Sequence, residues 1–346
     1  MKEKKQKFKR FFMAIFITLL IVSTMGIITY YSPHSSGTQW YADGPIFFPN
    51  ESFAPATVSV KDPSIVYYDG KWHVFFTGIS YDNDGVAVRS INYVSSPTLQ
   101  DLNSSTRRNI SVFSKNTKRT AAPQVFYFEP QGLWYLIAQA EYDGDRYIPI
   151  YLTTKNISDF TSWSSVQPLI EKFEKDKWID FWIICDNTTA YLFYTRNHEA
   201  MYYLSTSLAE FPNNFSTPTK VKGNIKVHEA SMVYKIEDKQ EYWLLTEVRY
   251  RGDLREFYLS KSSSLIAEWS DSILFATGGD LDFRGGEVWT TVVSHGEFIR
   301  SGYNQRMEIP SSEHIEFLIQ GTTLMNKIEY SAIPWRWGII RNFKDV

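Results

Sequence analysis

The chain has only one cysteine among its 346 residues, Cys185, so it cannot form an internal disulfide. This cysteine ends the apolar run from Trp182 to Cys185, a setting typical of a small core residue. The disulfide-stapled scaffolds of small secreted proteins are therefore excluded, and the fold has to be held by a hydrophobic core.

The chain also lacks an excess of charge of either sign. It has 36 Lys and Arg against 38 Asp and Glu, which gives a formal net charge of -2 at pH 7. Basic residues form no stripe beyond the extreme N-terminus. Because a nucleic-acid partner needs such a basic footprint, no nucleic acid is predicted to bind.

Apolar and aromatic side chains, in contrast, are abundant. Hydrophobic residues make up 43% of the chain and aromatic residues 16%, including 11 Trp. Aromatic residues favour β-strands, and this much apolar surface can fill one large all-β core. Disorder is thereby excluded outside the termini.

Five segments share one pattern, in which a polar side chain begins an apolar strand that is followed by a tight turn and a second strand. These polar residues recur at intervals of 49 to 62 residues and are Asp62, Gln124, Asp180, Glu229 and Glu287. Like units at a regular period indicate repeats arranged around one axis. We expect the five polar side chains to meet at a common mouth.

A second repeat is in phase with the first. After four of the hairpins, a further strand ends in an aromatic, an apolar and a hydroxyl residue: Tyr93-Val94-Ser95, Tyr151-Leu152-Thr153, Tyr203-Leu204-Ser205 and Tyr258-Leu259-Ser260. A unit of about 55 residues with three or four short strands is typical of a propeller blade. The sequence therefore predicts an all-β fold, a single five-bladed β-propeller over residues 51–346.

The N-terminus is predicted to be a separate segment. Residues 1–10 are basic, and residues 11–31 carry no charge and are long enough to cross a membrane as a helix. We expect a signal anchor, with residues 32–50 as a stalk and the propeller on the lumenal or extracellular side of a single-pass type II membrane protein. The alternative is a cleaved signal peptide and a secreted protein.

Six Asn-X-Ser/Thr sequons agree with export from the cytosol. They fall in turn-like or outer-strand segments, where a glycan would be solvated, at Asn50, Asn103, Asn109, Asn156, Asn187 and Asn214. A chain rich in Ser and Asn also yields such triplets by chance. The sequons therefore support the membrane or secreted location without establishing it.

Three of the polar strand starts are carboxylates with a clear chemical use: Asp62, Asp180 and Glu229. Cleavage of a glycosidic bond needs one carboxylic acid to protonate the leaving oxygen and one carboxylate to activate water or attack. A third carboxylate nearby can raise the pKa of the acid. The set favours glycoside hydrolysis.

Each carboxylate also has a simpler structural interpretation. Asp62 before Pro63 is typical of a turn, and Asp180 is typical of a residue that caps a strand end. Glu287 follows two glycines and fits a solvated loop better than a catalytic role. A catalytic role is favoured for Asp62, Asp180 and Glu229 because all three occur at the same position of the repeat.

Several motifs resemble those of glycoside hydrolase family 62, which are α-L-arabinofuranosidases that remove arabinose branches from arabinoxylan. The similar segments occur in the family's order over residues 38–342 and include KDPSIVYYDGKWHVFFTG, TAAPQVFYFEPQGLWYLI, WIDFWIICDNTTAYLFYTRN, HEASMVYKIEDKQEYWLLTE, SHGEFIRSGYNQRMEI with FLIQG, and YSAIPWRWGII. The resemblance implies a single five-bladed propeller, in agreement with the repeats.

The resemblance also implies roles for individual residues. Asp62 corresponds to the general base, Glu229 to the general acid, and Asp180 to the third carboxylate, which orients the substrate and tunes the acid. The residues implied to line the arabinose pocket are Lys61, Gln124 and Tyr330. His295 corresponds to a histidine associated with a calcium ion, although calcium prefers oxygen ligands and a buried, hydrogen-bonded histidine fits the sequence equally well. The chemistry itself needs no cofactor.

The chain departs from the family pattern at two places near the site. His228 stands where the family usually has Phe, beside the expected acid. After YLIAQ the chain lacks the tryptophan on which the family stacks the xylan backbone. Two alternatives therefore stay open beside arabinoxylan: another furanoside as substrate, or a propeller that binds carbohydrate without cleaving it.

Overall fold

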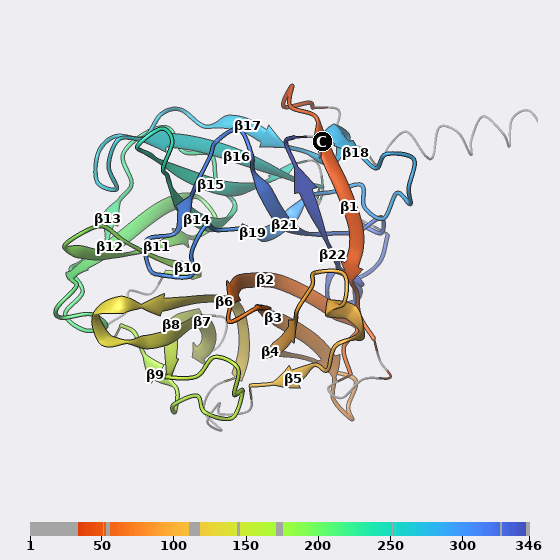
Figure 1. The fold of residues 1–346 in the computed structure, drawn as a ribbon, viewed down its shortest axis with the longest axis horizontal. Helices are drawn as coiled ribbons and strands as arrows, with labels where there is room; N and C mark the ends of the chain where they lie inside the picture. The colour runs from red at the N-terminus through yellow and green to blue at the C-terminus, as the bar shows by residue number, and fades with distance from the viewer. Residues whose placement is uncertain are drawn as a thin grey trace, which may run out of the picture.

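The protein is a ring of five β-sheets around one axis, which confirms the predicted five-bladed propeller (Figure 1). The computed structural model describes residues 34–50, 52, 56–110, 118–143, 146–170, 176–250, 252, 254–325 and 327–343. Within these ranges the regular structure consists of strands and four short 3₁₀ turns, η1 (Leu102–Ser104), η2 (Glu129–Gln131), η3 (Gly278–Asp280) and η4 (Tyr330–Ala332).

The first three blades have the same plan, with four antiparallel strands that follow one another in the chain. Blade one consists of β2 (Ser59–Tyr68), β3 (Lys71–Tyr81), β4 (Ala87–Ser96) and β5 (Arg108–Asn109). Blade two consists of β6 (Lys118–Phe128), β7 (Leu133–Asp143), β8 (Arg146–Thr154) and β9 (Gln167–Pro168). Blade three consists of β10 (Trp178–Cys185), β11 (Thr189–Arg196), β12 (Ala200–Ser207) and β13 (Thr219–Lys220).

The last two blades each add a parallel strand at one edge. Blade four consists of β14 (Glu229–Ile236), β15 (Glu241–Tyr250), β16 (Leu254–Ser262), β17 (Ile273–Ala276) and β20 (Glu308–Ile309). Blade five consists of β19 (Ser294–Phe298), β21 (Glu316–Gly321), β22 (Arg336–Arg341), β1 (Trp40–Phe47) and β18 (Leu281–Asp282).

The aromatic, apolar and hydroxyl triplets have the same place in each of the first four blades. All four lie in the third strand, and each tyrosine pairs with the short fourth strand: Tyr93 with Arg108, Tyr151 with Gln167, Tyr203 with Thr219 and Tyr258 with Leu274. The middle residue of each triplet is buried. The predicted second repeat is thus confirmed as the third strand of the blade.

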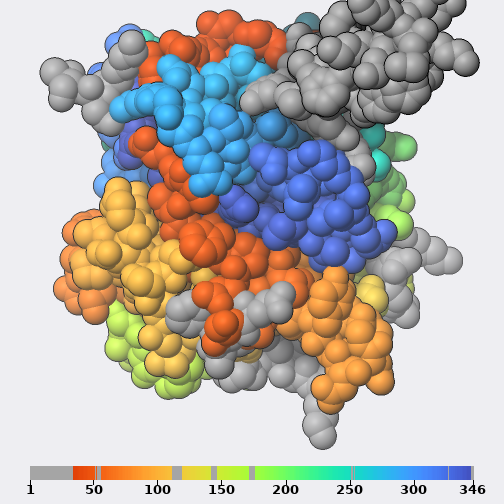
Figure 2. All heavy atoms as spheres, turned by 90° about the vertical axis from the view of Figure 1, so that its right-hand side faces the viewer, coloured from red at the N-terminus to blue at the C-terminus, as the bar shows by residue number. Residues whose placement is uncertain are grey.

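Blade five is completed by the start of the chain. β1 pairs antiparallel with β22, with Tyr41 opposite Arg341 and Phe47 opposite Trp337. Figure 2 shows this N-terminal strand beside the C-terminal strands. The prediction that residues 32–50 form a stalk was wrong for this stretch, because Trp40, Ala42 and Phe47 are buried in the core. The first strand of the described chain therefore belongs to the same blade as the last one.

Residues just before β1 are also attached to the propeller. Buried Asp280 accepts hydrogen bonds from the Ser35 hydroxyl at 2.6 Å and from the Ser36 N–H at 3.1 Å. The predicted span at residues 11–31 lies outside the described residues. No helix in the described ranges is both long and apolar enough to cross a membrane.

A buried ion pair ties three inner strands together. The Arg300 Nε and Glu297 Oε1 atoms are 2.7 Å apart, and both side chains are almost completely buried. Arg300 also donates to the carbonyls of Ile65 and Val125, and Glu297 accepts from the Ser64 hydroxyl at 2.6 Å. Because the charges are compensated and hydrogen bonded, the pair can occupy this apolar interior. Cys185 is buried in β10, as predicted.

Candidate active site

The site is built where the innermost strand of each blade is irregular. In every blade the pairing of first and second strands shifts register near the start of the first strand, which marks a β-bulge. The residues at this shift are Asp62, Ala122, Asp180, Ala230 and His295. The first four have positive φ angles of 50°, 49°, 57° and 62°. Such a backbone is strained for a residue other than glycine, and functional sites often hold strain of this kind.

This register corrects the predicted equivalence of the five polar residues. Only Asp62 and Asp180 occupy the same place in their blades. Gln124 lies two residues beyond its bulge, and Glu229 lies one residue before its own. Glu287 belongs to no inner strand and its side chain is 65% exposed, because β19 begins seven residues later. His295 takes the place predicted for Glu287.

Each bulge is held by a polar side chain from the second strand of the preceding blade. The N–H groups of Ala122, Asp180, His295 and Asp62 donate to Thr77, Gln139, Glu247 and Gln320, at 2.8, 2.9, 2.7 and 2.7 Å. In the remaining blade, Thr195 donates to the Ala230 carbonyl at 3.0 Å and Asp180 accepts the Ala230 N–H at 2.7 Å. These bonds satisfy backbone groups that the broken ladder leaves unpaired. They also fix the direction in which the bulge side chains point.

The bulges surround a cavity of about 180 Å³ at the centre of the ring. Six of the seven predicted site residues line it: Lys61, Asp62, Asp180, Glu229, His295 and Tyr330. The rest of the wall includes Arg89, Gln139, Tyr147, His198 and Gln320. Gln124 is not among the lining residues, because its side chain is 1% exposed and bonds the N–H and C=O of Ile183 in the next blade. In the structure Gln124 links two blades.

Asp62 shares its part of the cavity with a buried cation. The Lys61 Nζ atom is 3.7 Å from the Asp62 Oδ1 atom and 5.1 Å from the centre of the Tyr330 ring. Burial opposes the charge on Lys61, but the neighbouring Asp62, Tyr330 and Glu229 outweigh it and raise the pKa of the lysine. Lys61 is therefore a fixed positive charge beside Asp62. Asp62 itself is only 6% exposed, so a bound sugar would shield it from water.

Glu229 is paired with Arg255 of β16 and with Glu247 of β15. The Arg255 Nη1 atom lies 2.6 Å from Glu229 Oε1 and 3.3 Å from Glu247 Oε1. Burial tends to raise the pKa of Glu229, but Arg255, followed by Lys61 and His228, outweighs it and lowers the pKa to about 2. Burial, aided by Glu229, raises the pKa of Glu247 to about 7 against the attraction of Arg255. One cation between two carboxyls thus leaves one proton on the pair near neutral pH.

Asp180 and His295 both line the cavity and interact electrostatically. Burial raises the pKa of Asp180, and His295 and the N–H of Ala230 oppose the rise. Burial lowers the pKa of His295, but Asp180 and Asp62 lead a group of carboxylates that outweighs it and raises the pKa. Asp180 and His295 thus each stabilise the charged form of the other.

A calcium ion at His295 stays a prediction from the sequence resemblance. Calcium takes six to eight oxygen ligands. In the described parts of the chain, the one group of three side chains able to ligate a metal together is His198, His228 and Glu229, which does not include His295. Hydrolysis by a pair of carboxyl groups needs no cofactor.

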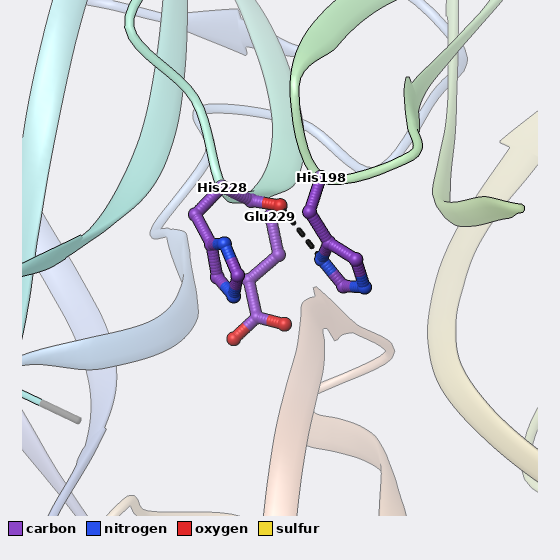
Figure 3. Close-up of side chains that lie close together, drawn as sticks. All are labelled: His198, His228 and Glu229. Carbon is purple, nitrogen blue, oxygen red and sulfur yellow. Dashed lines mark hydrogen bonds between the residues drawn. The ribbon is translucent and has the colours of Figure 1, made fainter. Parts of the chain in front are cut away.

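Two histidines lie beside Glu229 at the edge of the cavity (Figure 3). The rings of His198 and His228 are stacked, with centroids 4.6 Å apart and planes at 23°. The Nδ1–H of His198 donates to the His228 carbonyl at 3.0 Å. Burial lowers the pKa of His228 in spite of the nearby Glu229. Burial therefore favours the neutral form of the His228 imidazole.

Comparison with known proteins places this site in a family. Residues 39–341 match the sequence pattern of Glycosyl hydrolase family 62. The chain belongs to glycosyl hydrolase family 62. The motifs from KDPS to YSAIPWRWGII therefore identified the family correctly.

Relatives in family 62 align with nearly the whole propeller. Over 315 residues the chain is 34% identical to alpha-L-arabinofuranosidase C of Cellvibrio japonicus (strain Ueda107), with 88% of this chain and 47% of that protein covered. The chain thus spans about half the length of this curated relative. Its structure is similar to the catalytic domain of the Coprinopsis cinerea family-62 alpha-L-arabinofuranosidase, with a TM-score of 0.77, 29% identity and coverage of 89% and 98% of the two chains. A family-62 hydrolase in complex with xylotriose gives a TM-score of 0.76, 26% identity and coverage of 89% and 98%.

Sequence reasoning missed two charged residues of this family-62 site. Glu247 and Arg255 lie in the second and third strands of blade four, in stretches that read as ordinary strand. A signal was available, because Glu247 is opposite Glu229 in the hairpin register and a carboxylate facing a carboxylate needs a cation or a proton. Arg255 supplies that cation.

Proposed function

We propose that the protein is an α-L-arabinofuranosidase that removes arabinose branches from arabinoxylan with inversion of configuration. The observation that carries the proposal is the convergence of Asp62, Asp180 and Glu229 on one small cavity in a family-62 propeller. The name of the Cellvibrio relative supports the activity, and the xylotriose complex of a similar structure supports a xylan backbone as the carrier.

The size of the cavity favours a single sugar. Pockets for drug-sized ligands measure about 300 to 1,000 Å³, and this one measures about 180 Å³. A cavity of this size suits one terminal pentose, with the polymer lying across its mouth. Release of single branches, and not cleavage within a polysaccharide chain, is the reaction that such a shape favours.

In the proposed mechanism Asp62 is the general base. Its carboxylate takes a proton from a water molecule, which attacks the anomeric carbon of the arabinofuranosyl group. Lys61 beside it balances the charge of the carboxylate. Asp180 holds the Ala230 N–H next to Glu229 and so positions the acid relative to the sugar.

Glu229 is the proposed general acid, and its environment accounts for the source of the proton. Arg255 stabilises the ionised form of Glu229, so the proton is not held by Glu229 itself. Glu247 keeps a proton up to about pH 7 and hydrogen bonds to Glu229. The pair therefore has one proton to deliver to the leaving oxygen of the xylan hydroxyl. Rate should fall as the pH rises through about 7, because the pair then loses that proton.

The test is arabinose release by the purified protein from arabinoxylan and from an aryl α-L-arabinofuranoside. Replacement of Glu229 by Gln should lower the rate by about 10²- to 10⁴-fold on arabinoxylan, as expected for loss of a positioned acid. His314→Gln, an exposed histidine outside the cavity, is the control and should keep the wild-type rate. A folded protein that binds arabinoxylan without releasing sugar would favour a non-catalytic propeller, and release from another furanoside alone would change the substrate.

The location is a separate proposal. We infer from the basic and apolar N-terminus that residues 11–31 anchor the enzyme in a membrane, with the propeller on the lumenal or extracellular side. Of the six sequon asparagines, Asn156, Asn187 and Asn214 are exposed, which supports them as the best glycan acceptors.

A further inference from the structure

Three side chains that could ligate a metal lie together at the edge of the cavity, and the proposed hydrolysis gives a role to only one of them, Glu229. One ligand atom from each of His198, His228 and Glu229 lies within 4.8 Å of the others. His198 comes from the turn between β11 and β12, and the other two come from the start of β14 (Figure 3). All three side chains are only partly buried, so an ion from solvent can reach them.

The hydrogen bond of His198 is of the kind that prepares a histidine for metal binding. Metal-ligating histidines usually donate one ring N–H to a carbonyl or carboxylate, which fixes the tautomer of the other nitrogen. Nδ1 of His198 donates to the His228 carbonyl at 3.0 Å, so its Nε2 carries the lone pair. The same bond ties the two histidines to each other across blades three and four.

We propose that His198, His228 and Glu229 bind a borderline divalent cation such as Zn²⁺, and that the bound ion withdraws Glu229 from catalysis. Zn²⁺ holds nitrogen and oxygen ligands at about 2.0 to 2.2 Å, so ligand atoms in a tetrahedral site are about 3.3 Å apart. From within 4.8 Å, closure to that spacing needs shifts of about 1 to 1.5 Å, which side-chain rotations supply. The inhibitory part of this proposal rests on the proposed function, whereas the binding part does not.

The surrounding charges decide which ions can compete for this group. Arg255 contacts Glu229 Oε1 at 2.6 Å, and Arg249 and Lys61 add positive charge nearby. An ion that depends on charge attraction alone, such as Ca²⁺ or Mg²⁺, is therefore disfavoured. Zn²⁺ gains from two imidazole ligands, which calcium and magnesium do not prefer. Occupation would place a cation on the carboxylate that has to give a proton to the leaving group.

Binding is measured by titrating ZnCl₂ into the purified full chain, after removal of metals, by isothermal calorimetry in a buffer that does not chelate. We expect one saturable site per chain in the wild type. His228→Phe removes one ligand and keeps the ring, and it should weaken binding at least about 10-fold, since even indirect changes at metal sites cost 10- to 100-fold. His198→Gln should do the same, and the exposed His314→Phe should bind as the wild type does.

Two further readouts separate the parts of the proposal. Co²⁺ added in place of Zn²⁺ should give the visible absorption of a tetrahedral site, and the absorption should be lost in His228→Phe. In the arabinose-release assay, Zn²⁺ should inhibit the wild type, and His228→Phe should need about 10-fold more Zn²⁺ for half inhibition. Binding that is unchanged in both histidine variants would overturn the site. Binding of Zn²⁺ at the site without inhibition would show that the ion does not withdraw Glu229 from catalysis. A metal-free protein without activity would contradict the proposed function and leave the binding site unaffected.

Discussion

The raised pKa of Glu247 makes the stability of the protein depend on pH. Replacement of Glu247 by glutamine should remove this dependence. The pKa of Glu247 is raised from the ordinary 4.5 to about 7, so the folded protein holds the proton more tightly than the unfolded chain. This contribution is complete below pH 4.5 and is lost as the pH rises through 7. At 1.36 kcal/mol per pKa unit, the whole contribution is about 3 kcal/mol, and between pH 5 and pH 8 the loss is about 2 to 3 kcal/mol.

Replacement of Glu247 by Gln should abolish this loss. Glutamine resembles the protonated carboxyl, because its carbonyl can accept from His295 and its amide can donate to Glu229. The propeller itself shows that glutamine fits, since Gln139 and Gln320 occupy the same place in blades two and five and accept the same kind of backbone N–H. We therefore expect the variant to fold.

Urea unfolding at pH 5 and pH 8 measures the effect on the free energy of unfolding. The wild type should lose about 2 to 3 kcal/mol more than Glu247→Gln between the two pH values. Titrating groups that do not interact with Glu247 are common to both proteins and cancel in this difference. The matched control is Glu287→Gln, which changes an exposed glutamate and should keep the wild-type dependence. Equal slopes in wild type and Glu247→Gln would refute the raised pKa of Glu247.

Three further predictions test the mechanism, the N-terminal attachment and the location. Proton NMR of the first product should show β-arabinofuranose, whereas α-arabinofuranose or a sugar trapped on Asp62 would make Asp62 a nucleophile. A chain that begins at Thr38 should have a free energy of unfolding about 1 to 2 kcal/mol lower than one that begins at His34, because buried Asp280 loses its bonds to Ser35 and Ser36. Urea unfolding of the two chains measures this difference. Full-length protein should stay in the membrane pellet after a carbonate wash, and a soluble form starting near residues 26–32 would indicate a cleaved signal peptide.

The repeats in the sequence predicted the number of blades because they reflect local patterns. A hairpin and its third strand are close in the chain, so apolar alternation and the recurring tyrosine mark them directly. The strand β1 was not predicted as part of a blade because its partner β22 lies near the other end of the chain. Pairing over such a separation leaves no local signal, and the segment before residue 51 therefore read as a connection.

The same limit explains which site residues were found. Asp62, Asp180 and Glu229 were found because each begins an apolar strand. Glu247 and Arg255 were missed because a polar residue within a strand usually faces solvent, whereas both of these are buried beside Glu229. Gln124 is in the right blade but past its bulge, where the side chain faces the neighbouring blade.

The bulges also explain how one scaffold holds both catalytic and structural residues at equivalent places. A bulge leaves an N–H without a partner in its own sheet, and a neighbouring blade has to satisfy it. In four of the five blades that N–H donates to a second-strand side chain of the preceding blade, whereas the Ala230 N–H donates to the carboxyl group of Asp180. Asp180 thus completes the fold next to Glu229 and lines the cavity with the same side chain. Asp180→Ala would remove the acceptor of the Ala230 N–H and so disturb the backbone that carries Glu229. Asp180→Asn keeps an acceptor oxygen and removes only the charge. The asparagine variant therefore measures the effect of the charge of Asp180 on the rate of hydrolysis, whereas the alanine variant does not.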